Sequence, residues 1–151
     1  MASKSTTPGW IEIHALRCVG RHGAYDGEQD RVTSFLVDVA VRTDLAAAIE
    51  RDSLDATIDI AAIAQTAREV VGGPPRTLLE RVSSDVATAI LTRFPPVEEV
   101  RVRIVKPEPD GLGASAEAVA ITLMRPPGTA ARRAPTRPAK RGPRTRHRGR
   151  G

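Results

Sequence analysis

Hydrophobic and polar residues alternate along four segments of the chain, and this kind of alternation predicts half-buried β-strands. Residues 11–19 alternate and then slip by one position, which indicates a strand with a bulge. Residues 35–43 alternate without interruption, with Phe35 and three valines on one face. Residues 100–106 and 119–123 show the same pattern later in the chain. The alternation therefore predicts four strands.

Between the second and third predicted strands, the apolar spacing changes to that of helices. Residues 59–71 place isoleucine, alanine and valine on one stripe, and Gly72–Pro75 ends the pattern. Residues 78–93 carry a second stripe, which Pro95 and Pro96 end. The order strand, strand, helix, helix, strand, strand predicts an α+β fold, an antiparallel ββααββ sheet with two helices on one face. Such a sheet has open edges, which favour assembly with further copies of the chain.

Residues 126–151 differ in composition from everything before them. They contain nine Lys and Arg residues and no Asp or Glu, among Pro, Gly and Ala. The whole chain of 151 residues has a formal charge of +5, so residues 1–125 carry a net charge of −4. We therefore predict a flexible N-terminus over 1–9, one domain over 10–125, and a disordered basic tail over 126–151. Because the basic charge lies outside the domain, we expect no folded nucleic-acid-binding face, and only weak polyanion contact by the tail.

Several classes of protein are excluded by what the sequence lacks. No apolar run reaches the roughly 18–20 residues that cross a bilayer, and the first residues lack the apolar stretch of a signal peptide. Cys18 is the only cysteine, which excludes an internal disulfide and fits a reducing compartment. The three histidines are scattered, so no metal site is expected. We expect a cytoplasmic protein without membrane contact.

Three polar segments stand where chemistry is often found, and each also has an ordinary structural explanation. Gly20–Glu28 joins the first two strands, and closely spaced glycines are typical of a tight turn. Thr77 followed by Glu80 fits a helix capping box, although a carboxylate at a helix start also suits the paired N–H groups of a planar heterocycle. Lys106 ends the third strand, where a solvated lysine is common. Considered one at a time, these residues leave both interpretations open.

Taken together and in order, the segments resemble the dihydroneopterin aldolase family. The resemblance extends over residues 10–125, with the segments in matching order and spacing. The matching segments are Gly20–Glu28, Phe35–Val39, Asp44–Ala48, Asp52–Thr57, Leu78–Glu80 and Lys106–Pro107. No single segment is decisive, but together they identify the family.

The resemblance implies a fold, an assembly and a reaction. The fold is the tunnelling fold, whose subunits form homo-oligomeric rings, as a tetramer or octamer, in which the sheets make a barrel and active sites lie between adjacent subunits. The reaction is a step of folate biosynthesis that splits 7,8-dihydroneopterin into 6-hydroxymethyl-7,8-dihydropterin and glycolaldehyde. The implied partner is a small-molecule pterin. No metal or other cofactor is implied, because the dihydropterin ring takes up the developing charge.

The resemblance also implies roles for five residues. Glu80 would hold the amino and ring N–H groups of the pterin through two parallel hydrogen bonds. Leu79 and Ile60 would provide further contacts to the pterin. Lys106 would deprotonate the 2′-hydroxyl and reprotonate the enol product. Glu28 would lie close to Lys106 and order the side-chain hydroxyls or a bridging water.

The sequence departs from the family pattern at three places. Ile60 stands where the family has a tyrosine that relays a proton, and isoleucine cannot donate one. Val32–Phe35 replaces a Gly-Gln-x-Phe segment, and Asp110–Gly113 replaces an Ile-Pro element after the lysine. Loss of one proton relay costs on the order of 10²–10⁴ in rate.

Three functions are therefore compared. The first is a dihydroneopterin aldolase, an aldehyde-lyase. The alternative is a diverged pterin-binding paralogue, for example an epimerase of a dihydroneopterin derivative, because Ile60 replaces the family tyrosine. The third is a non-enzymatic interaction protein whose basic tail contacts RNA, DNA or another polyanion. Identification of the products formed from dihydroneopterin separates the first two.

Overall fold

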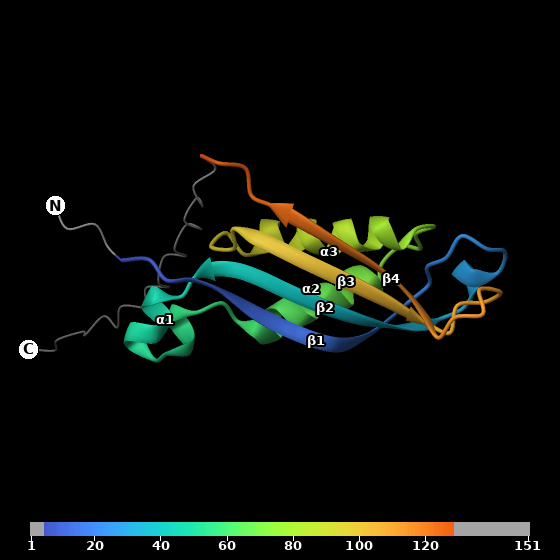
Figure 1. The fold of residues 1–151 in the computed structure, drawn as a ribbon, viewed down its shortest axis with the longest axis horizontal. Helices are drawn as coiled ribbons and strands as arrows, with labels where there is room; N and C mark the ends of the chain where they lie inside the picture. Colours follow the sequence, from blue (N-terminus) through green and yellow to red (C-terminus); the bar gives the residue numbers. More distant parts are fainter. Residues whose placement is uncertain (1–4, 129–151) are drawn as a thin grey trace, which may run out of the picture.

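The computed structural model describes residues 5–128, which form one sheet covered by a layer of helices (Figure 1). The strands are β1 (Pro8–Gly20), β2 (Thr33–Asp44), β3 (Glu99–Pro107) and β4 (Ala116–Met124). The helices are α1 (Ala46–Arg51), α2 (Ile60–Val71) and α3 (Leu79–Arg93), with two 3₁₀ turns, η1 (Glu28–Asp30) and η2 (Leu54–Ala56). The four predicted strands and the two long helices are thus confirmed. Most of the predicted basic tail, residues 129–151, lies outside the described residues.

The sheet follows the order of the chain. All neighbouring strands are antiparallel, in the order β1-β2-β3-β4, so β1 and β4 form its two edges. The helices that link β2 to β3 lie on one face, with α2 against β1 and α3 against β3 and β4 (Figure 1). This is the predicted antiparallel ββααββ sheet with two helices on one face.

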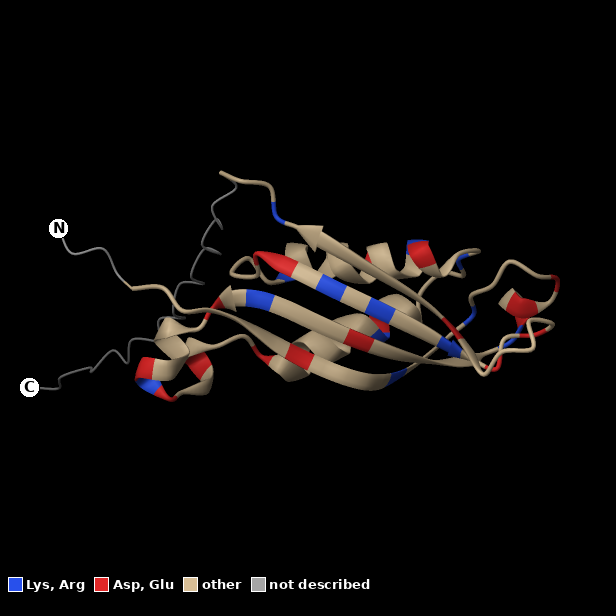
Figure 2. Ribbon diagram, viewed as in Figure 1, with Lys and Arg blue, Asp and Glu red and all other residues tan. Residues whose placement is uncertain are grey.

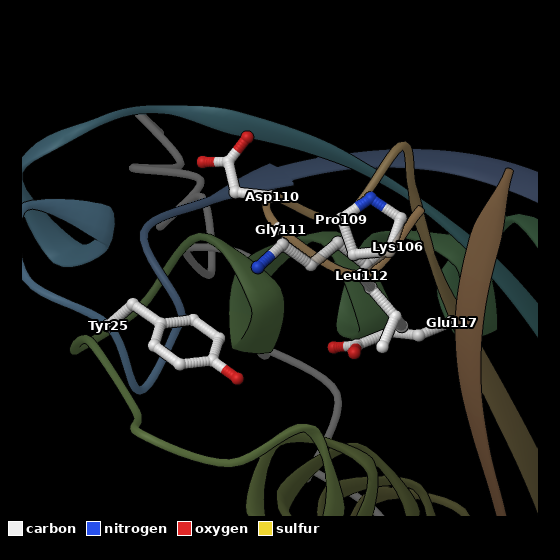
Figure 3. A pocket seen from close by; sticks show the side chains of 7 residues that line it. All are labelled: Tyr25, Lys106, Pro109, Asp110, Gly111, Leu112 and Glu117. Carbon is white, nitrogen blue, oxygen red and sulfur yellow. The ribbon is translucent and has the colours of Figure 1, made fainter. Parts of the chain in front are cut away.

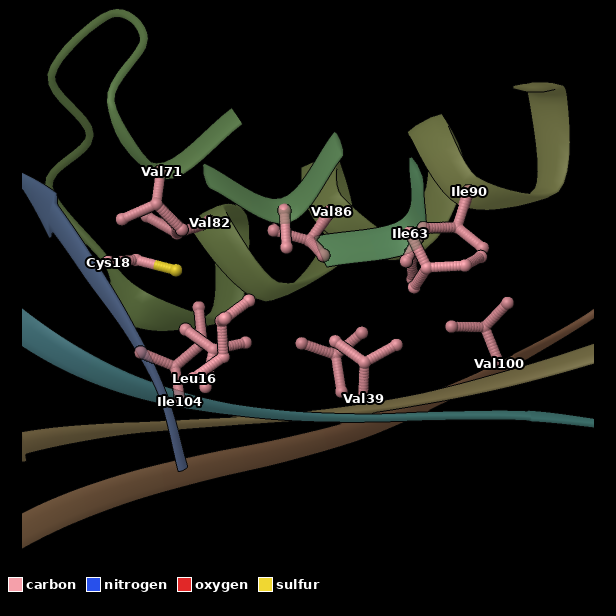
Figure 4. Close-up of a cluster of buried hydrophobic side chains, with 14 of the residues drawn as sticks. Leu16, Cys18, Val39, Ile63, Val71, Val82, Val86, Ile90, Val100 and Ile104 are labelled. Atoms are coloured by element: carbon pink, nitrogen blue, oxygen red, sulfur yellow. The ribbon is translucent and has the colours of Figure 1, made fainter. Parts of the chain in front are cut away.

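The core fills the space between the sheet and the two long helices (Figure 4). Val39 and Ile104 point from the sheet toward Ile63 of α2 and Val86 of α3, and all four are at most 2% exposed. Side chains alternate between the two faces of a strand, so Lys106, two positions after Ile104, points to the same helix-covered face. The alternation of β3 therefore brings a lysine to the end of the apolar core.

The predicted bulge in β1 lies between Ile13 and Leu16, where the pairing with β2 shifts register. Ala15 adopts a left-handed conformation with φ of 53°, and its N–H donates a hydrogen bond to Asp38 Oδ1 at 2.7 Å. The extra residue reverses the alternation, so that Leu16 and Cys18 face the core. The phase slip in the sequence has this bulge as its physical cause.

The helix starts show what the hydrophobic pattern alone does not predict. Asp59 caps α2, since its Oδ1 accepts hydrogen bonds from Ala61 N at 2.9 Å and Ala62 N at 3.3 Å. The short helix α1 was not predicted, and Asp44 Oδ1 accepts a hydrogen bond from Ala46 N at its first turn. With only six residues, α1 is too short to show a helical stripe.

The other face of the sheet is charged (Figure 2). Arg42 on β2 donates to Glu99 of β3 at 2.9 Å, and Arg103 on β3 lies 3.7 Å from Asp38 of β2. These residues alternate with the buried valines along the same strands, so the two faces have opposite character. Asp38 and Arg42 therefore point away from the core.

Candidate active site

A buried ion pair lies at the end of β3. Lys106 is 8% exposed and Glu28 is 3% exposed, and the Lys106 ammonium donates a hydrogen bond to Glu28 Oε2. The second carboxylate oxygen of Glu28 accepts a hydrogen bond from the backbone N–H of Tyr25 at 3.1 Å. The hydrogen bond from Lys106 lowers the pKa of Glu28 and outweighs the opposing effect of burial. Glu28 is therefore an anion whose buried charge is balanced by the lysine.

The loop that carries Glu28 is held in place by His22, which is 1% exposed. Its Nε2 lies 2.6 Å from the carbonyl oxygen of Val71, and its Nδ1 accepts a hydrogen bond from the N–H of Arg76 at 3.0 Å. Because Nδ1 accepts, the ring is neutral and Nε2 carries the proton that it donates to Val71. Burial lowers the pKa of His22, which keeps the ring neutral. His22 thus joins the Glu28 loop to the segment between α2 and α3.

Two glycines let the chain pass closely around this histidine. A Cβ at Gly20 would lie 2.2 Å from the carbonyl oxygen of Val71, and one at Gly23 would lie 2.5 Å from Glu28 Cβ. Both distances are too short for any larger residue without backbone movement. Gly23 N also donates a hydrogen bond to Arg76 O at 3.0 Å. The glycines of this loop are therefore required by close packing.

A pocket of about 260 Å³ opens beside the ion pair. The loop before η1, the first turn of α3, the end of β3 and the start of β4 enclose it. Its polar walls include Glu28, Lys106, Glu80 and Glu117, and Leu79 is a buried apolar wall. Four of the predicted site residues, from three separate parts of the chain, therefore meet in one cavity.

Of the two interpretations of Thr77 and Glu80, the structure does not show the capping box. Leu78, not Thr77, is the N-cap residue, and no side chain caps this helix start. Helix α3 begins at Leu79, which places Glu80 in the first turn, too close to the cap for the reciprocal hydrogen bond. Within residues 5–128, Glu80 has no hydrogen-bond or ion-pair partner, and its exposed carboxylate lines the pocket. The carboxylate remains available for a ligand.

A second cavity of about 330 Å³ adjoins the first, and Tyr25, Lys106 and Glu117 line both (Figure 3). Its far wall is the loop between β3 and β4. Asp110 of that loop accepts a hydrogen bond from Arg31 at 2.8 Å, which ties the loop to the start of β2. The hydrogen bond from Arg31 lowers the pKa of Asp110. Together the two cavities form a groove with the lysine at its centre.

Ile60 is the predicted site residue that the structure does not bring to this groove. It begins α2, and it is 39% exposed. Helix α2 rises by about 1.5 Å per residue, so Ile60 lies roughly 16 Å along the axis from Val71, where the helix meets His22. Within one copy of the chain, Ile60 therefore belongs to the opposite end of the helical layer.

Two groove residues were not assigned from the sequence. Tyr25, the only tyrosine of the chain, points its hydroxyl into the groove (Figure 3). Glu117 pairs with Lys106 in the register of β3 and β4 and points its carboxylate into the same space (Figure 3). The alternation of β4, continued back by two positions from Val119, would have placed Glu117 on the helix-covered face.

The groove combines two kinds of chemistry. The Lys106–Glu28 pair can exchange a proton with a bound hydroxyl, because both groups are held at fixed positions and one edge of the pair faces the cavity. Glu80 offers two acceptor oxygens to a planar molecule that presents two N–H donors. In the part of the chain that the structure describes, no three or more His, Cys, Asp or Glu side chains are placed to hold a metal ion.

The fold and groove define a class of protein: a tunnelling-fold subunit with a lysine–glutamate pair at the end of its sheet. Among solved structures, dihydroneopterin aldolase from E. coli in complex with neopterin matches with a TM-score of 0.71 and 29% identity, covering 76% of this chain and 98% of that chain. A uricase from Bacillus fastidious matches with a TM-score of 0.62 at 9% identity, over 83% of this chain and 48% of that chain, and shows the fold alone.

Sequence comparisons identify the family within this class. The dihydroneopterin aldolase profile matches residues 11–124. Dihydroneopterin aldolase of Bacillus subtilis is 30% identical over 115 residues, which are 76% of this chain and 95% of that protein. The enzyme of Streptococcus pyogenes is 34% identical over 115 residues, with 76% and 96% covered. The chain belongs to the dihydroneopterin aldolase family.

None of the helices within residues 5–128 combines the length and the apolar character needed to cross a bilayer.

Proposed function

We propose that this chain is a dihydroneopterin aldolase, a carbon–carbon lyase of cytoplasmic folate biosynthesis. The observation that carries the proposal is the buried Lys106–Glu28 pair facing a pocket in which Glu80 has a free carboxylate. The names of the relatives support cleavage over the diverged-paralogue alternative. The E. coli structure with neopterin supports a pterin as the ligand.

In this proposal, Glu80 selects the pterin. Its two oxygens accept hydrogen bonds from the amino group and a ring N–H of the pterin, which fixes both the position and the orientation of the ring. Leu79, which is 7% exposed, packs beside the ring. The pterin side chain then extends toward the lysine, since Glu80 and Lys106 line the same pocket.

Lys106 and Glu28 move the protons. Lys106 passes a proton to Glu28 and then, as a neutral amine, removes the proton from the 2′-hydroxyl; the bond between C1′ and C2′ breaks, and glycolaldehyde leaves. The electron pair of that bond moves into the dihydropterin as an enol, and Lys106 returns the proton to C1′ to give the hydroxymethyl product. Glu28 then returns its proton to the lysine, which restores the starting pair.

Tyr25 takes the proton-relay role that Ile60 cannot perform. It is the only tyrosine in the sequence, and it lines both cavities together with Lys106. Its hydroxyl can both donate and accept a hydrogen bond, which a relay requires.

The proposed working form is a homo-oligomeric ring, a tetramer or octamer, in which a neighbouring copy brings Ile60 to the pterin. The distance of Ile60 from the groove of its own chain supports this arrangement, as do the two open sheet edges. The single free cysteine, which is buried, supports a reducing compartment such as the cytoplasm.

The experiment that tests the proposal is incubation of the purified protein with dihydroneopterin, with chromatographic identification of the products. We expect hydroxymethyldihydropterin and glycolaldehyde in equal amounts. Glu80→Gln is expected to weaken neopterin binding by about 100-fold, because a neutral amide replaces a charged double acceptor. Glu50→Gln, an exposed carboxylate on α1, is the matched control and should bind like the parent. Formation of an epimer without glycolaldehyde would contradict the proposal.

A further inference from the structure

Glu117 occupies a position in the groove that the proposed mechanism does not use. It lies on β4 directly opposite Lys106 of β3, and paired residues of neighbouring strands place their side chains on the same face. Both residues line both cavities of the groove. The Glu117 carboxylate therefore lies beside the lysine, in the same pocket as Glu28.

The charges of the groove are compensated except at two carboxylates. Glu28 is paired with Lys106, and Asp110 is paired with Arg31 at 2.8 Å. Within residues 5–128, Glu117 has no hydrogen-bond or ion-pair partner. Glu80 also has no such partner within these residues, and its carboxylate would accept hydrogen bonds from the bound pterin.

The surroundings of Glu117 add negative charge rather than remove it. The carboxylates of Glu28, Glu80, Asp110 and Glu117 line the two cavities, and Lys106 is the one Lys or Arg among these lining residues. That lysine is already paired with Glu28. An anionic group brought next to Glu117 would therefore meet uncompensated repulsion, whereas a neutral hydroxyl would find a strong acceptor.

We propose that Glu117 determines which side chains the groove accepts. Its carboxylate accepts a hydrogen bond from a hydroxyl of the pterin side chain, and its charge excludes pterins whose side chain ends in a phosphate. This inference rests on the proposed function, because it places the side chain beside Lys106.

The test compares the binding of neopterin and neopterin 3′-phosphate by the quenching of pterin fluorescence. The parent protein should bind neopterin more tightly. In Glu117→Gln, binding of the phosphate ester should improve by about tenfold relative to neopterin, because one like charge is removed. Raising the salt to 1 M, where the Debye length is about 3 Å, should shrink the preference of the parent. Glu50→Gln should leave the ratio of the two affinities unchanged.

Charge reversal extends the test. Glu117→Lys should favour the phosphate ester over neopterin, and thermal melting establishes that each variant is folded. An unchanged ratio of the two affinities in both variants would overturn the role of Glu117. Binding does not depend on turnover, so absence of aldolase activity in the parent would reject the proposed function while the affinity ratio still decides this inference.

Discussion

At one end of the helical layer the chain buries a cluster of polar residues, and at the other end it leaves apolar residues exposed. At the C-terminal end of α2, His22, Glu28 and Lys106 are each at most 8% exposed, and every one is hydrogen-bonded. At the N-terminal end, Ile60 is 39% exposed and Leu54 of η2 is 89% exposed. One copy of the chain therefore builds the acid–base part of the site by itself, whereas Ile60 lies outside that part. This separation fits the proposed site shared between neighbouring copies.

Removal of Lys106 from the buried cluster should have the largest effect of the variants considered. Lys106→Met should lower turnover at least 10³-fold, because the lysine both removes the 2′-hydroxyl proton and returns the proton to C1′ in the proposed mechanism. It should also destabilise the fold by about 3–5 kcal/mol, since Glu28 would be left as a buried carboxylate without its counter-ion.

A second variant separates these two effects. The double variant Lys106→Met, Glu28→Gln removes the buried charge and should recover most of the thermal stability while remaining inactive. The measurements are initial rates with dihydroneopterin and thermal unfolding. Turnover of Lys106→Met within tenfold of the parent would remove the lysine from the mechanism.

Moving the tyrosine hydroxyl from position 25 to position 60 tests whether the two ends of the helical layer meet in one site. Tyr25→Phe removes only the hydroxyl and should lower kcat by about 10- to 100-fold with little change in neopterin affinity. Adding Ile60→Tyr to this variant should restore part of the loss, because residue 60 of a neighbouring copy would then supply the hydroxyl. A Tyr25→Phe variant as active as the parent would show that the relay lies elsewhere.

The smallest expected effect concerns the pH dependence of stability. Burial lowers the pKa of His22, so the unfolded chain binds a proton more readily than the folded one. The stabilisation by neutral His22 is full above the ordinary histidine pKa of about 6.5 and declines as the pH falls below it. Protonation of Nδ1 would also break the hydrogen bond from Arg76.

His22→Gln should flatten this decline and cost about 1–2 kcal/mol at neutral pH. His14→Gln, an exposed histidine on the charged face of β1, is the matched control and should retain the decline. Urea unfolding at a series of pH values between 5 and 8 measures both, and equal slopes for the parent and His22→Gln would contradict the account.

Much of the fold could be predicted from the sequence because its signals are local. Alternation gave the four strands, and even the bulge near Ala15 was visible as a slip in phase. The short helix α1 was missed because six residues are too few to show a helical stripe. The start of α3 was predicted to within one residue, but the role of Glu80 stayed open because Thr77 and Glu80 fit the spacing of a capping box whether or not a cap forms.

The site was predictable only in part, because its geometry is not local. The sequence indicated Glu28, Glu80 and Lys106 through a family resemblance, while the contact between Glu28 and Lys106 spans 78 positions and depends on the register of the sheet. Glu117 was not assigned to the site because only the pairing of β3 with β4 places it opposite Lys106. The loop conformation that turns Tyr25 into the groove has no signature in the residue pattern.

The measurement that tests the central claim most directly is turnover of dihydroneopterin in D₂O, followed by mass spectrometry of the pterin product. If Lys106 returns the proton to C1′, it delivers a deuteron, because its ammonium exchanges with the solvent. The account predicts one non-exchangeable deuterium in the hydroxymethyl group of every product molecule, and no product from Lys106→Met. Product without deuterium at C1′, or deuterated product from Lys106→Met at the parent rate, would contradict the claim that Lys106 of the buried pair is the proton donor.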